Sequence, residues 1–244
     1  HCINLSDAGL ITAGTEHADK ITAILSELNQ ITAAKVWELK DPYEKSVPSV
    51  EVSYNDFDDL LSCVDITCAE SLINNDKTSI MDVCCYIYTS GTTGLPKAAI
   101  VTNQRLTAMG VFFGRYMVDM KPTETMYASS PLYHTMGLSF GFGSVLVLGA
   151  TLALRRHFSA TEFWADTRKY DVNVFVYIGE LCRYLVNQPE TANDKNHSVR
   201  AMAGVGMRPD VWRVFKKRFG IKDVHEMYGA TEGAGGIFNL TGRI

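Results

Sequence analysis

Apolar β-prone runs alternate with amphipathic helical patterns through the second half of this 244-residue chain. The β-prone runs predict strands over 125–129, 172–177, 199–205 and 224–228. Apolar residues at helical spacing predict helices over 137–148, 180–187 and 209–219. Successive strand–helix units imply a mostly parallel sheet with right-handed crossovers, flanked by helices. The predicted fold class is therefore α/β.

Three of the predicted helices have a defined inward face. Ser159 and Glu162 form a capping box that opens one of them. The residues predicted to face inward are Phe163, Trp164, Thr167 and Tyr170 in that helix, Leu181, Tyr184 and Leu185 in the next, and Val211, Trp212, Phe215 and Phe219 in the last. The first half of the chain is less regular. It predicts a strand over 9–13, a helix over 16–28, a strand over 35–39 and, over 41–80, an irregular surface excursion with only short helical patches.

The run from Tyr88 to Lys97 carries the strongest functional signal, with the sequence Tyr-Thr-Ser-Gly-Thr-Thr-Gly-Leu-Pro-Lys. It supplies hydroxyls, glycines that let backbone N–H groups turn toward an anion, and one positive charge. The hydroxyls belong to Thr89, Ser90, Thr92 and Thr93, the glycines are Gly91 and Gly94, and the charge is that of Lys97. The flanking runs 83–88 and 98–101 are β-prone, and Cys84 and Cys85 are interpreted as core residues of a buried strand. A loop of this kind between two strands predicts a cradle for a triphosphate.

The spacing differs from that of the ordinary P-loop. In that motif the lysine directly follows the second glycine and opens a helix. Here Leu95 and Pro96 separate Gly94 from Lys97, and the next residues favour a strand. The run therefore indicates another kind of nucleotide-binding loop, and a flexible polar hairpin is the alternative.

Three further loops follow predicted strands, where ligands bind in an open α/β sheet. The last offers Tyr228 as a π-face for a purine, Thr231 as a hydrogen-bond donor to phosphate and Glu232 as a hard oxygen ligand for Mg²⁺. Gly204 and Gly206 would let the backbone pass against an adenine ring, although an ordinary strand-to-helix turn explains them equally well. His134 follows an apolar loop, where a lone histidine is more often structural.

The stretch 132–154 contains no Asp, Glu, Lys or Arg and is followed by Arg155 and Arg156, so a membrane span must be weighed. Glycines interrupt it, and Gly149-Ala150-Thr151 is a natural helix stop. A helix, a turn and a buried strand are predicted instead.

The net charge and the cysteine pattern exclude some classes of ligand and partner. A net charge of −4 argues against nucleic acid. The six cysteines form no C-x-x-C pair and no histidine cluster accompanies them, which argues against zinc and favours a reducing compartment.

The phosphate-loop run resembles that of the adenylate-forming superfamily, which contains acyl-CoA synthetases, luciferases and peptide-synthetase adenylation domains. The segments 86–101, 177–189 and 228–233 narrow the resemblance to the fatty acid transport protein branch, the very-long-chain acyl-CoA synthetases. The resemblance runs through nearly the whole chain. It implies that residues 1–101 end a first α/β subdomain of a large N-terminal domain and that residues 102–244 belong to a second.

This resemblance implies a reaction in which a fatty carboxylate attacks the α-phosphate of MgATP and CoA then displaces AMP. Thr89 to Gly94 and Lys97 would hold the β- and γ-phosphates, Thr231 the α-phosphate and Glu232 the Mg²⁺. His134 would sit where the carboxylate meets the α-phosphate. The residues implied to contact adenine are Gly204, Val205, Gly206, Met207 and Tyr228, and Gly229 and Ala230 are implied to bind the cofactor beside them. Ala234 departs from the polar residue that the branch often has there.

The resemblance also implies parts that are not in the given residues: a ribose-binding aspartate, a hinge, a C-terminal lid domain with its lysine, and a membrane anchor. We therefore expect an internal fragment that is inactive alone, from a protein at the endoplasmic reticulum, plasma membrane or peroxisome with its catalytic part cytosolic. Two other hypotheses stay open. One is a fatty acid transporter or binding module without ligase activity, which would need 132–154 to span a bilayer. The other is an adenylating enzyme for a different carboxylic acid, against which the segment 177–189 argues.

Overall fold

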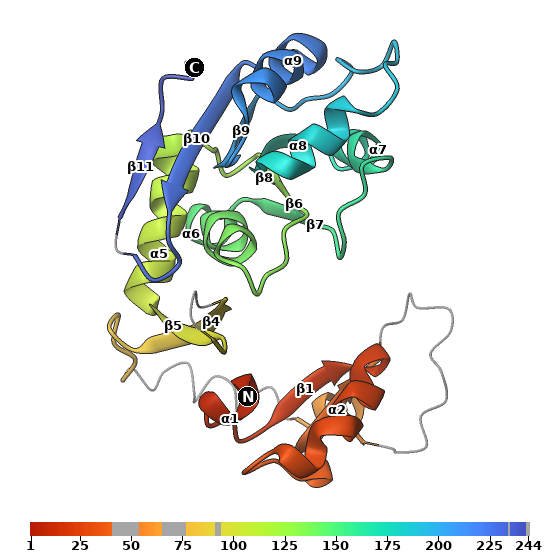
Figure 1. Ribbon diagram of the computed structural model, residues 1–244, viewed down its shortest axis with the longest axis vertical. Coiled ribbons are helices and arrows are strands. Elements are labelled where there is room, and N and C mark those ends of the chain that lie inside the picture. Colours follow the sequence, from red (N-terminus) through yellow and green to blue (C-terminus); the bar gives the residue numbers. More distant parts are fainter. Residues whose placement is uncertain (41–53, 65–76, 91–93, 234, 243–244) are drawn as a thin grey trace. The chain divides into compact units, whose positions relative to one another are not determined.

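The computed structural model describes residues 1–40, 54–64, 77–90, 94–233 and 235–242, in two compact units. The first unit comprises His1–Thr78 and Tyr88–Ala98, and the second comprises Ser79–Ile87 and Ala99–Ile244. Each unit has its own sheet (Figure 1).

The first unit is built on a three-stranded parallel sheet in the order β1-β2-β3. Its elements are α1 (Cys2–Leu5), β1 (Ile11–Gly14), α2 (Ala18–Ile24), β2 (Val36–Leu39), β3 (Asn55–Asp56) and α3 (Phe57–Ser62), with short 3-10 turns at Thr15–His17, Leu25–Glu27 and Ala33–Lys35. Ala18, Ile21, Ile31, Val36 and Tyr54 form its core. The predicted helix over 16–28 is therefore divided between α2 and two 3-10 turns. The short helix α3 agrees with the short helical patches predicted within 41–80, and Asp56 caps it by accepting a hydrogen bond from the Asp58 N–H at 2.9 Å. The two-residue strand β3 was not predicted there.

The strands β4 (Val83–Thr89) and β5 (Lys97–Thr102) form a two-stranded sheet around the phosphate-loop run. The prediction of a buried β4 was wrong for most of its residues. Ile87 is buried, but Cys84 is exposed and Cys85 is half-buried. Among the described residues β4 shares its sheet with β5 alone, so little packs on either of its faces.

The second unit is built on a six-stranded sheet in the order β11-β10-β9-β8-β6-β7. Its strands are β6 (Thr125–Ala128), β7 (Thr151–Leu154), β8 (Val172–Ile178), β9 (Ala201–Val205), β10 (Asp223–Gly229) and β11 (Gly236–Asn239). All neighbours pair in parallel except β10 and β11, which are antiparallel. This confirms the predicted α/β class with a mostly parallel sheet.

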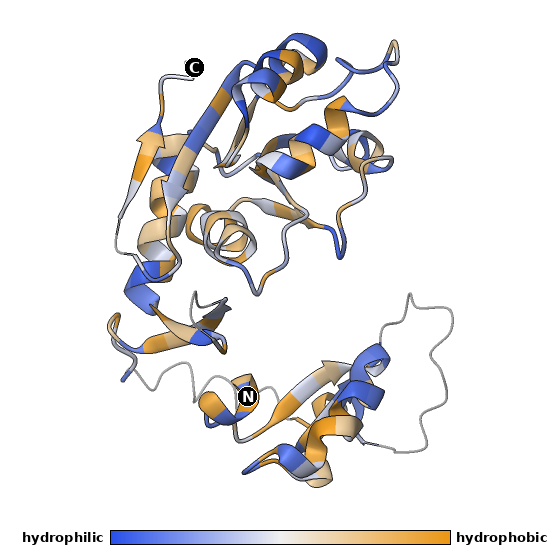
Figure 2. Ribbon diagram, viewed as in Figure 1, coloured by the Kyte–Doolittle hydropathy of each residue, from blue (hydrophilic) through white to orange (hydrophobic). Residues whose placement is uncertain are grey.

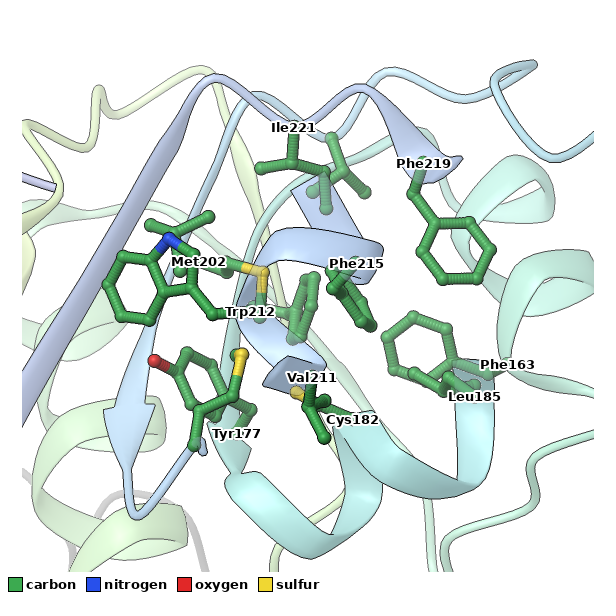
Figure 3. Packing of buried hydrophobic residues seen from close by; sticks show 14 of the residues in the cluster. Phe163, Tyr177, Cys182, Leu185, Met202, Val211, Trp212, Phe215, Phe219 and Ile221 are labelled. Atoms are coloured by element: carbon green, nitrogen blue, oxygen red, sulfur yellow. The ribbon is translucent and has the colours of Figure 1, made fainter. Parts of the chain in front are cut away.

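Helices cover both faces of this sheet (Figure 1). The helical segments are α5 (Asn103–Val111), η4 (Phe112–Met117), η5 (Met136–Phe142), α6 (Gly143–Leu148), α7 (Phe163–Lys169), α8 (Gly179–Val186) and α9 (Pro209–Phe219). Alternate strand residues face opposite layers. Phe175 and Tyr177 pack with α7, α8 and α9, and Figure 3 shows Tyr177 in this cluster. Val174 and Val176 pack on the other side with η4, η5 and α6.

The inward face of α9 is confirmed, since Val211, Trp212, Phe215 and Phe219 are all buried. Figure 2 shows hydrophilic and hydrophobic residues sharing its turns. Two other inward assignments were wrong. Tyr170 is 48% exposed because α7 ends at Lys169, and Tyr184 is 42% exposed because Cys182 and Leu185 take the buried face of α8.

The apolar stretch 132–154 contains η5 and α6, seven and six residues long, followed by β7. The helical path ends at Gly149, whose φ of 67° is the left-handed conformation that glycine adopts without strain. No helix in the described part of the chain is long and apolar enough to cross a membrane. The helix and turn are confirmed, but β7 is an edge strand with half-exposed residues rather than a buried one.

Candidate active site

A cavity of about 470 Å³ opens in the second unit where strands β8, β9 and β10 end. Its wall is formed by the loop after β6, by α5, η4 and η5, by the three strand ends, by the turn after β10 and by β11. The lining residues are Ala108, Met109, Phe112, His134, Thr135, Met136, Phe140, Ile178, Val205, Met227, Tyr228, Gly229, Ala230, Thr231, Gly233, Gly235, Gly236 and Phe238. The cavity therefore lies at the sheet edge where ligands bind in open α/β folds.

Six residues singled out from the sequence line this cavity together. They are His134, Val205, Tyr228, Gly229, Ala230 and Thr231. The hydroxyl of Thr135 donates a hydrogen bond to the Thr231 hydroxyl at 3.2 Å, which links the loop after β6 to the turn after β10. The His134 ring lies 4.8 Å from that of Tyr133, centroid to centroid, and Tyr228 is 77% exposed. Polar and aromatic groups from distant parts of the sequence thus meet at one end of the sheet.

The rest of the wall is apolar, and its role was missed in the sequence. It is made mainly of methionines and phenylalanines: Met109, Met136, Met227, Phe112, Phe140 and Phe238. The rings of Phe112 and Phe238 lie 4.6 Å apart, between η4 and β11. Methionine side chains adapt to irregular apolar ligands. Helical spacing alone could not show that Met109 faces a cavity rather than packed core.

The turn Gly204–Met207 runs beside the cavity, and of its residues only Val205 is part of the lining. Gly206 has a φ of 73°, which favours glycine. Its conformation is supported by Glu226, a half-buried carboxylate within β10. Burial raises the pKa of Glu226, and the hydrogen bonds that it accepts act in the opposite direction. Sequence reasoning missed Glu226, whose only signal was a carboxylate inside a β-prone run.

Arg105 supports the turn after β10, and sequence reasoning missed this residue too. Its guanidinium, on α5, donates to the carbonyl oxygen of Thr231 and, at 2.6 Å, to that of Gly233. The carboxylate between them belongs to Glu232, which is exposed. Arg105 therefore fixes the backbone that carries both predicted phosphate and Mg²⁺ ligands.

The phosphate-loop run is described only at its two ends. Gly91, Thr92 and Thr93 lie outside the described residues. Thr89 ends β4, Ser90 and Gly94 are exposed, and the exposed Lys97 begins β5. The hydroxyl of Tyr88 donates to the Cys2 carbonyl at 2.7 Å, and His1 Nε2 donates to the Pro96 carbonyl at 3.2 Å. These residues belong to the first unit, whereas the cavity residues belong to the second.

Comparison with known proteins places the chain among adenylate-forming enzymes. Residues 1–243 match the family described as AMP-binding enzyme. Long-chain fatty acid transport protein 6 of Mus musculus is 38% identical over 244 residues, which cover 100% of this chain and 38% of the relative. Long-chain fatty acid transport protein 3 of Mus musculus is 47% identical over 165 residues, or 68% of this chain and 24% of the relative. The chain thus spans well under half the length of these relatives.

Solved structures share the fold. An anthranilate CoA ligase in complex with anthranoyl-AMP superposes with a TM-score of 0.78 at 16% identity, covering 95% of this chain and 42% of the other. An acyl-CoA synthetase of Brucella canis superposes with a TM-score of 0.76 at 22% sequence identity, covering 98% of this chain and 42% of the other. The family match, the strand-end cavity and the sequence similarity agree, and the chain belongs to the AMP-binding enzyme family, with a sequence similar to the long-chain fatty acid transport proteins.

Proposed function

We propose that this chain is part of an AMP-forming ligase that activates a long- or very-long-chain fatty acid, first to an acyl-adenylate and then to acyl-CoA. The cavity is the main support for this proposal, because it joins an apolar wall of methionine and phenylalanine to a polar part formed by Tyr228 at the end of β10 and Thr231 in the turn after it. A fatty acid needs both surfaces: an apolar one for its tail and a polar one where its carboxylate meets ATP. The relatives named as long-chain fatty acid transport proteins support this substrate class.

In the first step a carboxylate oxygen attacks the α-phosphorus of ATP, and the bond to the leaving pyrophosphate breaks. In the second step the CoA thiol attacks the acyl carbon, loses its proton and releases AMP. The protein contributes mainly positioning and charge stabilisation. One neighbouring structure is that of an ATP-bound protein, and another holds an acyl-adenylate, which supports ATP as the activating substrate.

Each predicted residue receives a role in this proposal. Thr89 to Gly94 with Lys97 hold the β- and γ-phosphates, and Thr231 binds the α-phosphate. His134 stands where carboxylate and α-phosphate meet. The turn 204–207 and residues 228–230 enclose the adenine.

Mg²⁺ would be held by Glu232 and would neutralise charge on the phosphates. No group of three or more His, Cys, Asp or Glu residues in the described ranges could hold a metal by itself. A single exposed carboxylate nevertheless fits Mg²⁺, which proteins usually bind through one or two carboxylates together with substrate phosphates and water. The backbone that carries Glu232 is fixed by Arg105 on either side of it.

We further propose that residues 1–101 end one α/β subdomain and that 102–244 belong to the next, and that a lid domain completes the site in the whole protein. Association of the whole protein with a membrane is inferred from the relatives' names alone. Uptake without ligation, which required residues 132–154 to cross a bilayer, loses its support because that stretch forms η5, α6 and an edge strand.

The test is ATP–pyrophosphate exchange by the whole protein with Lys97→Ala and Glu232→Gln variants. Each change removes one preorganised charge from the triphosphate–Mg²⁺ complex, and we expect a loss of roughly 100-fold in rate, about 3 kcal/mol. Lys222→Ala and Glu190→Gln, at exposed positions away from the cavity, are matched controls and should exchange normally. Near-normal exchange in both test variants would remove these residues from the mechanism.

A further inference from the structure

We propose that Glu226 and Tyr177 form a clamp that positions the Gly206–Met207 turn beside the cavity and so sets the affinity for the nucleotide. The inference deepens the proposed function and rests on it for the identity of the ligand. Glu226 is a positioning residue here and does not contact the reacting atoms.

The carboxylate of Glu226 gathers three donors. Its Oε1 accepts from the Met207 backbone N–H at 2.8 Å and from the Tyr177 hydroxyl at 2.8 Å, and its Oε2 accepts from the Gly206 N–H at 3.0 Å. The Tyr177 hydroxyl also lies 2.8 Å from the carbonyl oxygen of His225. One carboxylate on β10 thereby connects the end of β8 with the turn after β9.

The turn is pressed against β8 by contacts between backbones. A Cβ added to Gly179 would lie 2.0 Å from the Gly206 carbonyl oxygen, and one added to Gly204 would lie 2.0 Å from the Tyr177 carbonyl oxygen. Gly204 and Gly206 have no side chain to brace the turn there, and only Met207, at its end, packs into the core cluster around Tyr177. The backbone N–H groups of Gly206 and Met207 are held by Glu226, and hydrogen bonds from backbone N–H to a carboxylate are among the stronger ones in proteins.

Tyr177 holds the Glu226 carboxylate in position. Its ring is 1% exposed and packs in the core cluster of Figure 3, so its hydroxyl has a set position. The clamp acts on the cavity through its neighbours in sequence, because Val205 precedes Gly206 and Tyr228 follows Glu226 by two residues, and both line the cavity. A shift of the turn would therefore move one wall of the nucleotide site.

The test compares Glu226→Gln and Tyr177→Phe with Asp223→Asn, an exposed carboxylate at the other end of β10. Glutamine presents an NH₂ group where one of the oxygens accepted an N–H, so at least one hydrogen bond is lost. In the whole protein we expect the KM for ATP in pyrophosphate exchange to rise about 10-fold in Glu226→Gln and about 3-fold in Tyr177→Phe. The kcat and the KM for fatty acid should stay within about 2-fold of the parent, and Asp223→Asn should behave as the parent.

A second measurement is independent of catalysis. Amide hydrogen exchange at Gly206 and Met207 without ligand should be at least about 10-fold faster in Glu226→Gln. Unchanged exchange there, or an unchanged KM for ATP in an active Glu226→Gln variant, would overturn the clamp. A fall in kcat with no change in KM would overturn it as well. If the parent shows no pyrophosphate exchange, the proposed function fails, and amide exchange still decides whether the clamp exists. If Glu226→Gln does not fold, Tyr177→Phe carries both measurements.

Discussion

At the scale of single residues, the neighbours of His197 require its neutral form. Nδ1 accepts a hydrogen bond from the Val199 N–H at 3.2 Å, while Nε2 lies 3.1 Å from the Phe219 carbonyl oxygen. A carbonyl oxygen only accepts, so Nε2 carries the proton and Nδ1 carries none. The ring stacks on Trp164 at a centroid distance of 4.6 Å. Burial lowers the pKa of His197 below the ordinary value of 6.5.

We therefore expect the protein to lose stability as the pH falls below about 6.5. Below that pH the unfolded chain binds a proton at His197 that the folded chain does not, so the free energy of unfolding decreases as the pH falls. His225, whose pKa burial also lowers, adds to the same trend. Thermal unfolding between about pH 7.5 and about pH 5.5 would measure it.

Control variants distinguish the contribution of His197 to the pH dependence of stability from that of the acidic groups. His197→Phe keeps an aromatic ring on Trp164 but cannot titrate, so its melting temperature should depend less on pH, even if it is lower throughout. His157→Gln, at an exposed position, should keep the full pH dependence. An equal slope in His197→Phe and the parent would contradict the assignment.

Sequence motifs identified the side chains that line the cavity, but they did not identify the residues that hold the backbone of the cavity wall in place. His134 and Thr231 lie in loops after strands and Tyr228 lies near the end of β10, and the structure brings all three to one cavity. Arg105 and Glu226 act on backbone far away in the sequence, and a local pattern carries no sign of such partners.

At the scale of elements, Arg218 fastens the segment after α8 to helix α9. It donates to the carbonyl oxygens of Val186, Gln188 and Pro189 at 2.7 to 2.8 Å and to the carboxylate of Asp194 at 2.6 Å. The Arg218 side chain is only 8% exposed and that of Asp194 only 12%. Burial tends to raise the pKa of Asp194, but hydrogen bonds from Arg218 and Thr191 hold it below its ordinary value. One guanidinium therefore donates hydrogen bonds to three backbone carbonyl oxygens and one carboxylate of the segment from the end of α8 to Asp194.

We expect Arg218→Ala to destabilise the protein by about 3 kcal/mol, because it leaves a buried carboxylate and three carbonyl oxygens without their donor. Arg218→Lys should rescue little, since one ammonium cannot reach four acceptors spread over a planar fork. Lys217→Ala, the exposed neighbour on α9, is the control and should change stability by less than about 0.5 kcal/mol. Denaturant unfolding measures all three, and a small effect of Arg218→Ala would show that water replaces the guanidinium.

Helices with strong hydrophobic periodicity and clear capping residues could be predicted from the sequence. The burial of an element could not be predicted where it depends on which other elements pack beside it. Pro209 at its first turn and Gly220 at its end mark α9, whose inward face was assigned correctly. The exposure of Tyr184 on α8 and of β7 depends on which elements pack beside them. The segment 177–189 was recognised by resemblance, but its anchoring by Arg218 required the fold.

At the scale of the whole molecule, the two units have separate cores. The cluster around Ile21 and Val36 contains residues of the first unit only, whereas the two clusters on either face of the β6–β10 sheet contain residues of the second only. The family resemblance implied two subdomains that meet between residues 101 and 102, but it gave no sign that the chain passes between the units at residues 79, 88 and 99. The core of the second unit is also larger than that of the first. Strand β8 alone contributes five fully buried residues to it, Val172 and 174–177.

This division predicts that a core mutation weakens its own unit. Ile21→Ala and Phe175→Ala each remove a large buried side chain and should cost about 2–5 kcal/mol in the unit concerned. In amide hydrogen exchange, Ile21→Ala should speed exchange in α2 and β2 and leave β8 and β9 as slow as in the parent, because local opening follows local packing. Phe175→Ala should speed exchange in β8, β9 and α9 and spare α2. Tyr116→Ala, at a side chain that is 70% exposed, is the surface control. Faster exchange of β8 and β9 in Ile21→Ala would show instead that the two cores unfold as one cooperative unit.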